Sequence, residues 1–179
     1  MGVSVAVDGI KGKCLSFDDD YDYVSLNTVP IFDLHDAFSV SLYIKPKAHD
    51  LSKTKSLITN STAYIGFFRG WEFSLDSANH LSLRLIHRLP DNYIQVVTEG
   101  AVVLDEWSQV AFTYAGMGKA SDIALYINGE KQKTSVLTDQ LTRTIKPFNG
   151  YYTKLDSVPL RLGKSYREWS GDIGIFVGN

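Results

Sequence analysis

The sequence predicts an all-β fold, an antiparallel two-sheet jelly-roll β-sandwich, on the basis of three observations. Apolar and polar residues alternate over many short segments, as in strands that bury one face. Turn-forming Gly, Asn, Asp and Pro separate these segments. No window has sustained helical periodicity. We therefore expect about eleven strands, most of them joined by short turns.

The expected strands follow from this alternation in chain order. The first two, residues 13–17 and 23–26, flank the acidic stretch DDDYD. In residues 37–46 every second residue from Phe38 to Ile44 is apolar, and Pro46 ends the strand because proline cannot donate to a ladder. The later segments with the same pattern are SLITN, GWEFSLDS, HLSLRLIHR, YIQVVTE, WSQVAFTYA, DIALYING, PLRLG and GDIGIFV.

The most specific turn signal lies in the stretch DIALYINGEK, residues 122–131. Ile123, Leu125 and Ile127 share one strand face. Asn128 and Gly129 both tolerate a positive φ, as a two-residue type I′ turn requires. This stretch is expected to be a strand, a tight turn and the start of the next strand.

Length and composition indicate the number of domains and argue against some classes of partner. With 179 residues and no repeat or linker, the chain is expected to be a single domain over residues 1–179, excised from a larger protein. The net charge of −2 and the absence of a basic run weigh against nucleic acid as a partner. No apolar stretch approaches the roughly 20 residues of a membrane span. Cys14 is the only cysteine, which excludes an internal disulfide.

Several motifs, in a shared order, resemble the laminin G-like, concanavalin A-type jelly-roll domains. In that family a W-x-x-V-A-x-T-Y segment leads into L-Y-x-N-G. The matching residues here are Trp107, Val110, Ala111, Thr113, Tyr114, Leu125, Tyr126, Asn128 and Gly129. Trp107 precedes a strand and matches a packing position of the family, so the resemblance implies that it lies in the core. The stretches RGWEFSL, LRLIHRLPDNYIQVVT and GKASDIALYINGE are similar to the module within large exported bacterial proteins that also carry c-type cytochrome segments and uncharacterised domains.

This resemblance implies an accessory module of an extracytoplasmic protein, secreted or attached to the envelope, that contacts other domains of its parent. The family often ends GDIDDVRIY, whereas this chain reads GDIGIFVGN. Asp172 remains and the two following acids are absent. Any role that those acids have in the family is therefore lost here.

A ligand site is expected on one open sheet face. Sugar rings stack on aromatic side chains, and their hydroxyls pair with carboxylates and arginine. The polar-phase residues expected to share this face are Tyr43, Glu72, Ser74, Arg84 and Tyr126. The loop residues expected at its rim are His87, Arg88, Asn92 and Trp169. For His87 the alternative is a satisfied, partly buried side chain.

The acidic stretch is a candidate calcium site, because calcium prefers oxygen ligands and many laminin G-like domains hold calcium at a sandwich rim. The candidate ligands are Asp18, Asp20, Asp22 and the distant Asp172. The alternative is a solvated acidic turn in which one aspartate caps the loop.

Three function classes remain open, in order of preference. The first is a non-catalytic ligand-binding module, for which a poly- or oligosaccharide is the favoured ligand. The second is a structural spacer that packs on neighbouring domains. The third is a glycoside hydrolase or lyase. It is disfavoured because Glu72 and Asp76, the nearest carboxylate pair on one strand, stand about 13 Å apart at the strand rise, beyond the separation of under about 10 Å that glycosidases use.

Overall fold

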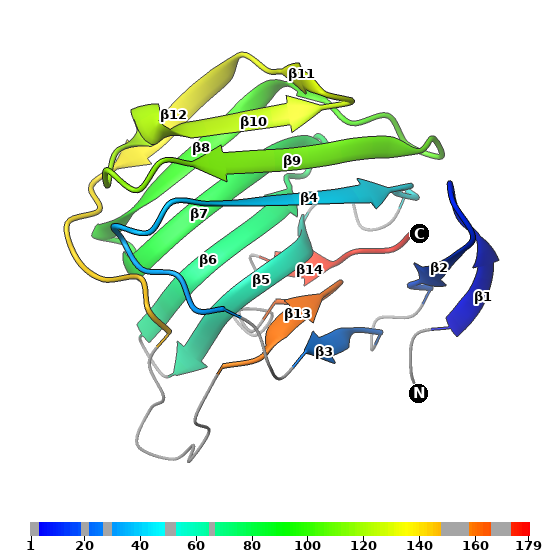
Figure 1. Cartoon of the computed structure of the whole chain (residues 1–179), viewed down its shortest axis with the longest axis horizontal. Coiled ribbons are helices and arrows are strands. Elements are labelled where there is room, and N and C mark those ends of the chain that lie inside the picture. Colours follow the sequence, from blue (N-terminus) through cyan, green and yellow to red (C-terminus); the bar gives the residue numbers. More distant parts are fainter. Residues whose placement is uncertain are drawn as a thin grey trace.

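A computed structural model describes residues 4–18, 22–26, 30–48, 53–64, 67–147, 158–165 and 173–179. Two sheets face each other (Figure 1). The smaller has the order β11 (Glu130–Lys131), β10 (Ile123–Ile127), β9 (Ser108–Tyr114) and β4 (Phe38–Ile44). The larger has the order β12 (Thr134–Asp139), β8 (Asn92–Ala101), β7 (His80–Arg88), β6 (Phe67–Leu75), β5 (Thr54–Tyr64), β13 (Leu160–Leu162) and β3 (Val24–Leu26).

Two further elements complete the strands. β14 (Ile173–Ile175) pairs with β5 in parallel. β1 (Ser4–Asp8) and β2 (Lys13–Ser16) form a separate antiparallel hairpin. Within the described ranges the only helix is the single 3₁₀ turn η1 (Ala120–Asp122), and no helix is long and apolar enough to cross a membrane. The predicted all-β sandwich is therefore confirmed.

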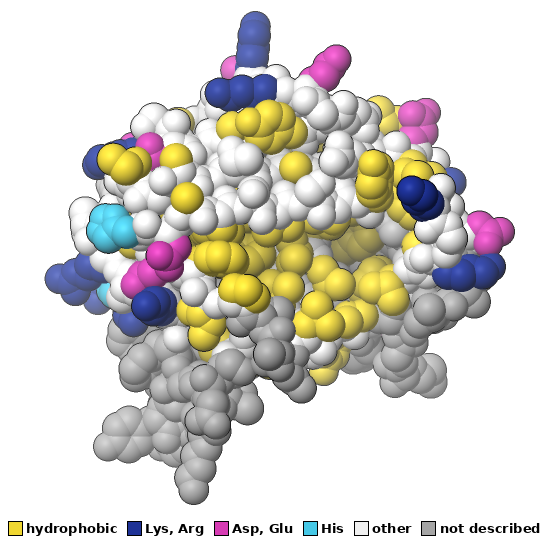
Figure 2. All heavy atoms as spheres, viewed as in Figure 1, with side chains coloured by type: hydrophobic (Ala, Val, Ile, Leu, Met, Phe, Trp, Pro, Cys, Tyr) yellow, Lys and Arg dark blue, Asp and Glu magenta, His cyan; other side chains and the backbone are white. Residues whose placement is uncertain are grey.

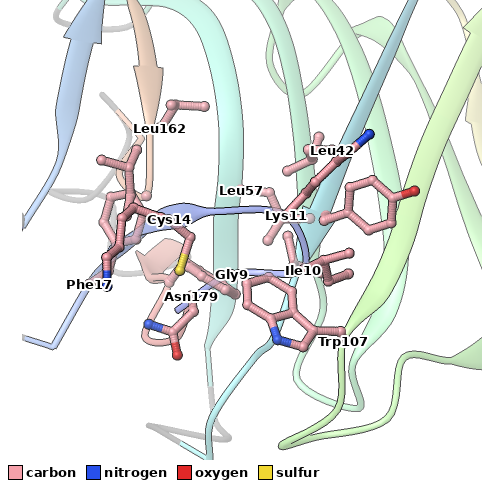
Figure 3. A pocket seen from close by; sticks show the side chains of 16 residues that line it. Gly9, Ile10, Lys11, Cys14, Phe17, Leu42, Leu57, Trp107, Leu162 and Asn179 are labelled. Atoms are coloured by element: carbon pink, nitrogen blue, oxygen red, sulfur yellow. The ribbon is translucent and has the colours of Figure 1, made fainter. Parts of the chain in front are cut away.

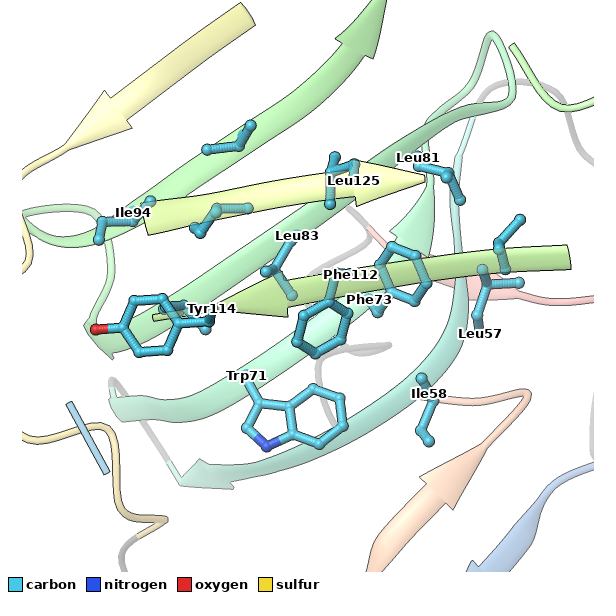
Figure 4. Packing of buried hydrophobic residues seen from close by; sticks show 14 of the residues in the cluster. Leu57, Ile58, Trp71, Phe73, Leu81, Leu83, Ile94, Phe112, Tyr114 and Leu125 are labelled. Atoms are coloured by element: carbon cyan, nitrogen blue, oxygen red, sulfur yellow. The ribbon is translucent and has the colours of Figure 1, made fainter. Parts of the chain in front are cut away.

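Strand alternation places the core between the sheets, as the sequence predicts. Trp71, Phe73 and Leu75 of β6 are at most 2% exposed, and Leu81, Leu83 and Leu85 of β7 are fully buried. From the smaller sheet, Val110 belongs to the same buried cluster. Phe112 and Leu125 pack against the larger sheet (Figure 4). Aromatic rings cross the interface: the ring centroid of Phe112 lies 5.1 Å from that of Phe73 and 5.7 Å from that of Trp71. Both are edge-on contacts, an arrangement that aromatic pairs favour.

One end of the sandwich is closed by segment 140–147, which follows β12. Asp33 Oδ1 accepts hydrogen bonds from Thr144 Oγ1 at 2.6 Å, from the Ile145 amide at 3.0 Å and from the Leu34 amide at 2.7 Å. Burial alone would raise the pKa of Asp33, but these donors and the nearby Lys146 ammonium hold it below its usual value. The carboxylate therefore fastens this segment to the loop before β4.

The predicted turn at Asn128-Gly129 is also confirmed. Ile127 pairs with Glu130, and the two residues between them have φ angles of +52° and +80°. A Cβ added at Gly129 would meet nothing within 4 Å. Glycine is needed at this position for its backbone conformation and not for lack of space.

Replacing Gly129 with valine should lower the free energy of unfolding by about 1–3 kcal/mol, because a β-branched residue is strained at positive φ. Thermal or urea unfolding measures the loss. The Gly129→Asn variant is the matched control, since asparagine tolerates this conformation, and it should lose far less. A valine variant as stable as the wild type would contradict the turn assignment.

Replacing Asp33 with asparagine should lower stability by about 1–2 kcal/mol at pH 7, because hydrogen bonds to a charged acceptor are lost. A lowered carboxyl pKa contributes stability above the unfolded value of about 3.9, and this contribution disappears as the pH falls through the folded value. The gap between variant and wild type should therefore narrow below about pH 3.9. Glu106→Gln, at an exposed position, is the control and should be about as stable as the wild type at pH 7.

Candidate functional site

The outer face of the smaller sheet is open and carries two of the predicted ligand residues. On β4, Ser39, Ser41 and Tyr43 point away from the core, and Tyr43 is 56% exposed. Tyr126 on β10 pairs with Ala111 of β9, which in turn pairs with Ser41. Residues that oppose each other in a ladder share a face, so Tyr43 and Tyr126 lie on the same side of the sheet.

The two tyrosines lie on a polar surface, and the exposed Lys131 of β11, which opposes Tyr126 in the ladder, borders it. One strand separates β4 from β10, which sets their side chains about 10 Å apart across the sheet. Between them, Gln109 pairs with Tyr43 in register and its Nε2 donates to Ser41 Oγ at 3.0 Å. The remaining outward residues of β4, β9 and β10 are Ser39, Ala111, Thr113 and Ala124. We call this surface the tyrosine face.

The expectation that all five polar-phase residues share one open face is wrong. Glu72 and Ser74 lie on β6 and Arg84 lies on β7, so these three belong to the larger sheet. Glu72 and Ser74 are 1% and 2% exposed, and Arg84 is half-buried. Alternation separates the two faces of each strand, as expected, but it does not tell which sheet a strand joins.

On the larger sheet Glu72 and Arg84 belong to a row of polar side chains that crosses seven strands. Successive register pairs join Ser25, Arg161, Thr59, Glu72, Arg84, Gln95 and Thr138. Ser165 Oγ lies within hydrogen-bond distance of Glu72 Oε1, and both side chains are buried. At its centre the row is therefore buried and hydrogen-bonded, which indicates a structural network.

Two of the predicted rim residues hold segment 140–147 in place. Asn92 Nδ2 donates a hydrogen bond to Thr142 Oγ1 at 2.8 Å. Asn92 Oδ1 accepts a hydrogen bond from the backbone N–H of Thr142 at 3.1 Å. His87 Nδ1 lies 2.8 Å from the Thr144 carbonyl oxygen and therefore donates to it. Arg88 pairs with Asp91 on the surface. This matches the alternative reading of His87 as a satisfied, partly buried side chain.

Electrostatics at His87 favour its neutral form. Burial lowers the pKa of His87, and the nearby positive charges of Arg69, Arg143 and Arg88 lower it further, while the bond to the Thr144 carbonyl acts in the opposite direction. Arg69 also approaches this ring, with Nη2 3.4 Å from His87 Nε2. Sequence patterns do not reveal Arg69, because it becomes a neighbour of His87 only through strand pairing.

The calcium prediction is only partly covered by the structure. Asp22 is 2% exposed, and its Oδ2 accepts the Asp18 amide at 3.1 Å, so one aspartate caps this loop. Asp20, Asp172 and the predicted rim residue Trp169 lie outside the described residues. Within those residues no three acidic, histidine or cysteine side chains cluster as metal ligands do. Calcium binding stays a prediction.

A pocket of about 350 Å³ opens at the flank beneath β4, and the sequence did not predict it. Figure 2 shows hydrophobic side chains gathered in this hollow. In Figure 3, Trp107 stands beside Gly9 and Ile10 of the β1–β2 turn, and Cys14 and Asn179 lie on the opposite side. Trp107, expected in the core, is half-buried and lines this pocket, because it precedes β9 at the edge of the sandwich.

Comparisons with known proteins agree with this architecture. A carbohydrate-binding module, the CBM40 of the Ruminococcus gnavus IT-sialidase, superposes with a TM-score of 0.55 at 16% identity, covering 80% of this chain and 72% of that one. The same module bound to α2,3-sialyllactose gives 0.54 at 17% identity, over 78% and 69%. A heptameric SAP-like pentraxin of Limulus polyphemus gives 0.52 at 14% identity, over 98% and 70%. At such identities these likenesses establish the fold alone.

The sequence itself identifies the family. No curated protein matches the chain. A laminin G-type family model, described as concanavalin A-like lectin/glucanases superfamily, matches residues 18–173, which is most of the chain and spans strands of both sheets. The matched region contains the Trp107–Tyr114 and Leu125–Gly129 segments whose pattern suggested this family. The chain belongs to the concanavalin A-like lectin/glucanase superfamily.

Proposed function

We propose that this domain is a non-catalytic carbohydrate-binding module that holds a poly- or oligosaccharide across the tyrosine face. The observation that carries the proposal is the pair of tyrosines on one open sheet surface. The C–H faces of a sugar ring stack on phenol rings. Gln109, Ser39 and Ser41 supply amide and hydroxyl groups for the sugar hydroxyls.

Two further points support binding. The solved neighbours include a carbohydrate-binding module that was captured with sialyllactose. In addition, the tyrosine face needs little rearrangement to receive a ligand, because β4, β9 and β10 form a continuous ladder beneath it. A rigid sheet presents its side chains to a ligand with little loss of conformational freedom.

The environments of Glu72 and Asp76, the carboxylate pair closest to the arrangement of a glycosidase, support a non-catalytic role. Glu72 is buried beside Ser165, away from the solvent. Asp76 lies in the β6–β7 turn, where Oδ1 accepts the amides of Ala78 and His80 at 2.8 and 2.9 Å. Both groups are thus engaged in structural hydrogen bonds. A glycosidase needs two carboxyl groups facing the same scissile bond.

One observation favours the alternative of a spacer that packs on a neighbouring domain. On β12, the edge strand of the larger sheet, Val136 and Leu137 are 54% and 61% exposed. An exposed apolar edge strand is a typical place for contact with another polypeptide. This edge lies on the larger sheet, so packing there and glycan binding on the smaller sheet are compatible.

We also place the module in an extracytoplasmic protein, secreted or attached to the envelope. The support is the resemblance to modules of exported bacterial proteins. Fractionation of cells that produce the parent protein tests this location, and recovery of the protein from the cytoplasm alone would contradict it.

A glycan-array screen of the domain, followed by calorimetry with the best oligosaccharide, tests the binding proposal. The Tyr43→Ala and Tyr126→Ala variants should each weaken binding at least tenfold, because loss of one stacked ring costs about 1–3 kcal/mol when bases stack on aromatic side chains, and we expect sugars to behave similarly. Circular dichroism should show that both variants stay folded, since both side chains lie outside the core.

The control is Tyr23→Ala, which removes a tyrosine that is 42% exposed and lies outside the tyrosine face. This variant should bind as the wild type does. Wild-type affinity in both Tyr43→Ala and Tyr126→Ala would refute the tyrosine face as the site. Absence of any glycan hit for the wild type would refute the proposed function.

Calcium is proposed as a stabilising ligand of the acidic loop. A ligand that binds only the folded state raises the melting temperature by mass action. Millimolar calcium should therefore raise the melting temperature relative to chelator, and Asp18→Asn should reduce the difference. Identical melting curves in calcium and in chelator would remove this proposal.

A further inference from the structure

The pocket beneath β4 has the composition of a binding site for an apolar ligand. Its walls come from both sheets and from the β1–β2 hairpin. The apolar residues that line it include Ile10, Leu15, Leu42, Leu57, Leu162 and Phe176. Its volume of about 350 Å³ falls within the range of about 300–1,000 Å³ that small-molecule sites have. Sugar hydroxyls would lose hydrogen bonds to water in such a pocket, so it suits a different ligand from the tyrosine face.

The pocket exists because the two sheets differ in width. β4 is the edge of the smaller sheet, whereas the larger sheet continues past β5 to β13 and β3. Core-facing side chains of these outer strands therefore lack a strand opposite them. Leu42 and Leu162 remain half-buried, although both belong to the apolar phase of their strands.

The charged side chains that line the pocket are all positive. Lys11 and Lys13 line it, and among its described lining residues none is acidic. Lys13 Nζ is held 2.7 Å from Asp8 Oδ1, whereas Lys11 makes no ion pair within the described part of the chain. Asn179 adds a donor: its Nδ2 is buried at the pocket and has no hydrogen-bond partner among the described residues.

We propose that this pocket binds a small amphipathic carboxylate, with the apolar body between the sheets and the carboxylate at Lys11. The Lys11 ammonium is a donor of opposite charge, which suits a carboxylate. Binding of the apolar body is favourable because it removes apolar surface from water, both on the ligand and on the leucine and phenylalanine side chains of the pocket. Tyr43 also lines this pocket, so the pocket adjoins the tyrosine face, but the proposal does not depend on glycan binding.

Cys14 provides a direct readout of occupancy, because it lines the pocket and is the only cysteine of the chain. Octanoate is the probe, and octylamine is the matched control with the same chain and the opposite charge. With octanoate at ten times its measured Kd, alkylation of Cys14 by iodoacetamide should slow about tenfold, since only about a tenth of the pockets stay empty. Calorimetry should give octanoate a Kd at least about fivefold lower than that of octylamine.

Two variants separate charge recognition from folding. Lys11→Glu should remove the preference for octanoate over octylamine, and Lys131→Glu, an equal change of an exposed lysine on β11, should leave it intact. Protection of Cys14 by octanoate, lost after Leu162→Trp fills the pocket, would support the proposal. Equal protection by both probes, or no protection by either, would overturn it. Dimerisation on octanoate addition, seen by sedimentation, would also overturn it, since it would assign the protection to a subunit interface.

Discussion

Aromatic packing between the two sheets is the constraint on which the rest of this structure depends. The ring of Phe38 on β4 lies 5.6 Å from Trp71 and 5.4 Å from Phe112, measured between centroids. Phe112 on β9 in turn meets Phe73 on β6. These rings join the smaller sheet to the larger one. Once they are buried, alternation dictates which residues of each strand reach the surface.

Both proposed sites follow from this packing and from the unequal width of the sheets. With Phe38 and Phe112 inside, Tyr43 and Gln109 must point outward, which creates the tyrosine face. Among the described residues the smaller sheet ends at β4, while the larger sheet continues past β5, and the apolar pocket lies at this flank. The first site is polar because it lies outside the sandwich, and the second is apolar because it is part of the interior that remained open.

Local sequence patterns predicted the local features of this fold. The alternation in GWEFSL places Phe73 inside and Glu72 on the opposite face, and Asn128-Gly129 predicts its turn through backbone conformation alone. Strand β12 escaped prediction because exposed Val136 and Leu137 are adjacent, which breaks the alternation of a half-buried strand. Trp107 was misassigned because its family position indicates packing but not how far the core extends.

The candidate site was harder to predict, because a site depends on strands that are distant in sequence. Tyr43 and Glu72 have the same outward phase, yet they belong to different sheets. The sequence predicts that Asn92 is an exposed loop residue, but its side chain is hydrogen-bonded to Thr142, which is fifty residues further along the chain. Long-range pairing of this kind is set by the packing of whole sheets, and no single-strand pattern encodes it.

Backbone amide NMR of the labelled domain, titrated with the best glycan of the array, tests the central claim most directly. The account predicts that the largest shift changes fall on the amides of Ser41, Tyr43, Gln109 and Tyr126, on three adjacent strands of the smaller sheet. Changes concentrated instead on Glu72, Arg84 and Gln95, across the polar row of the larger sheet, would contradict it.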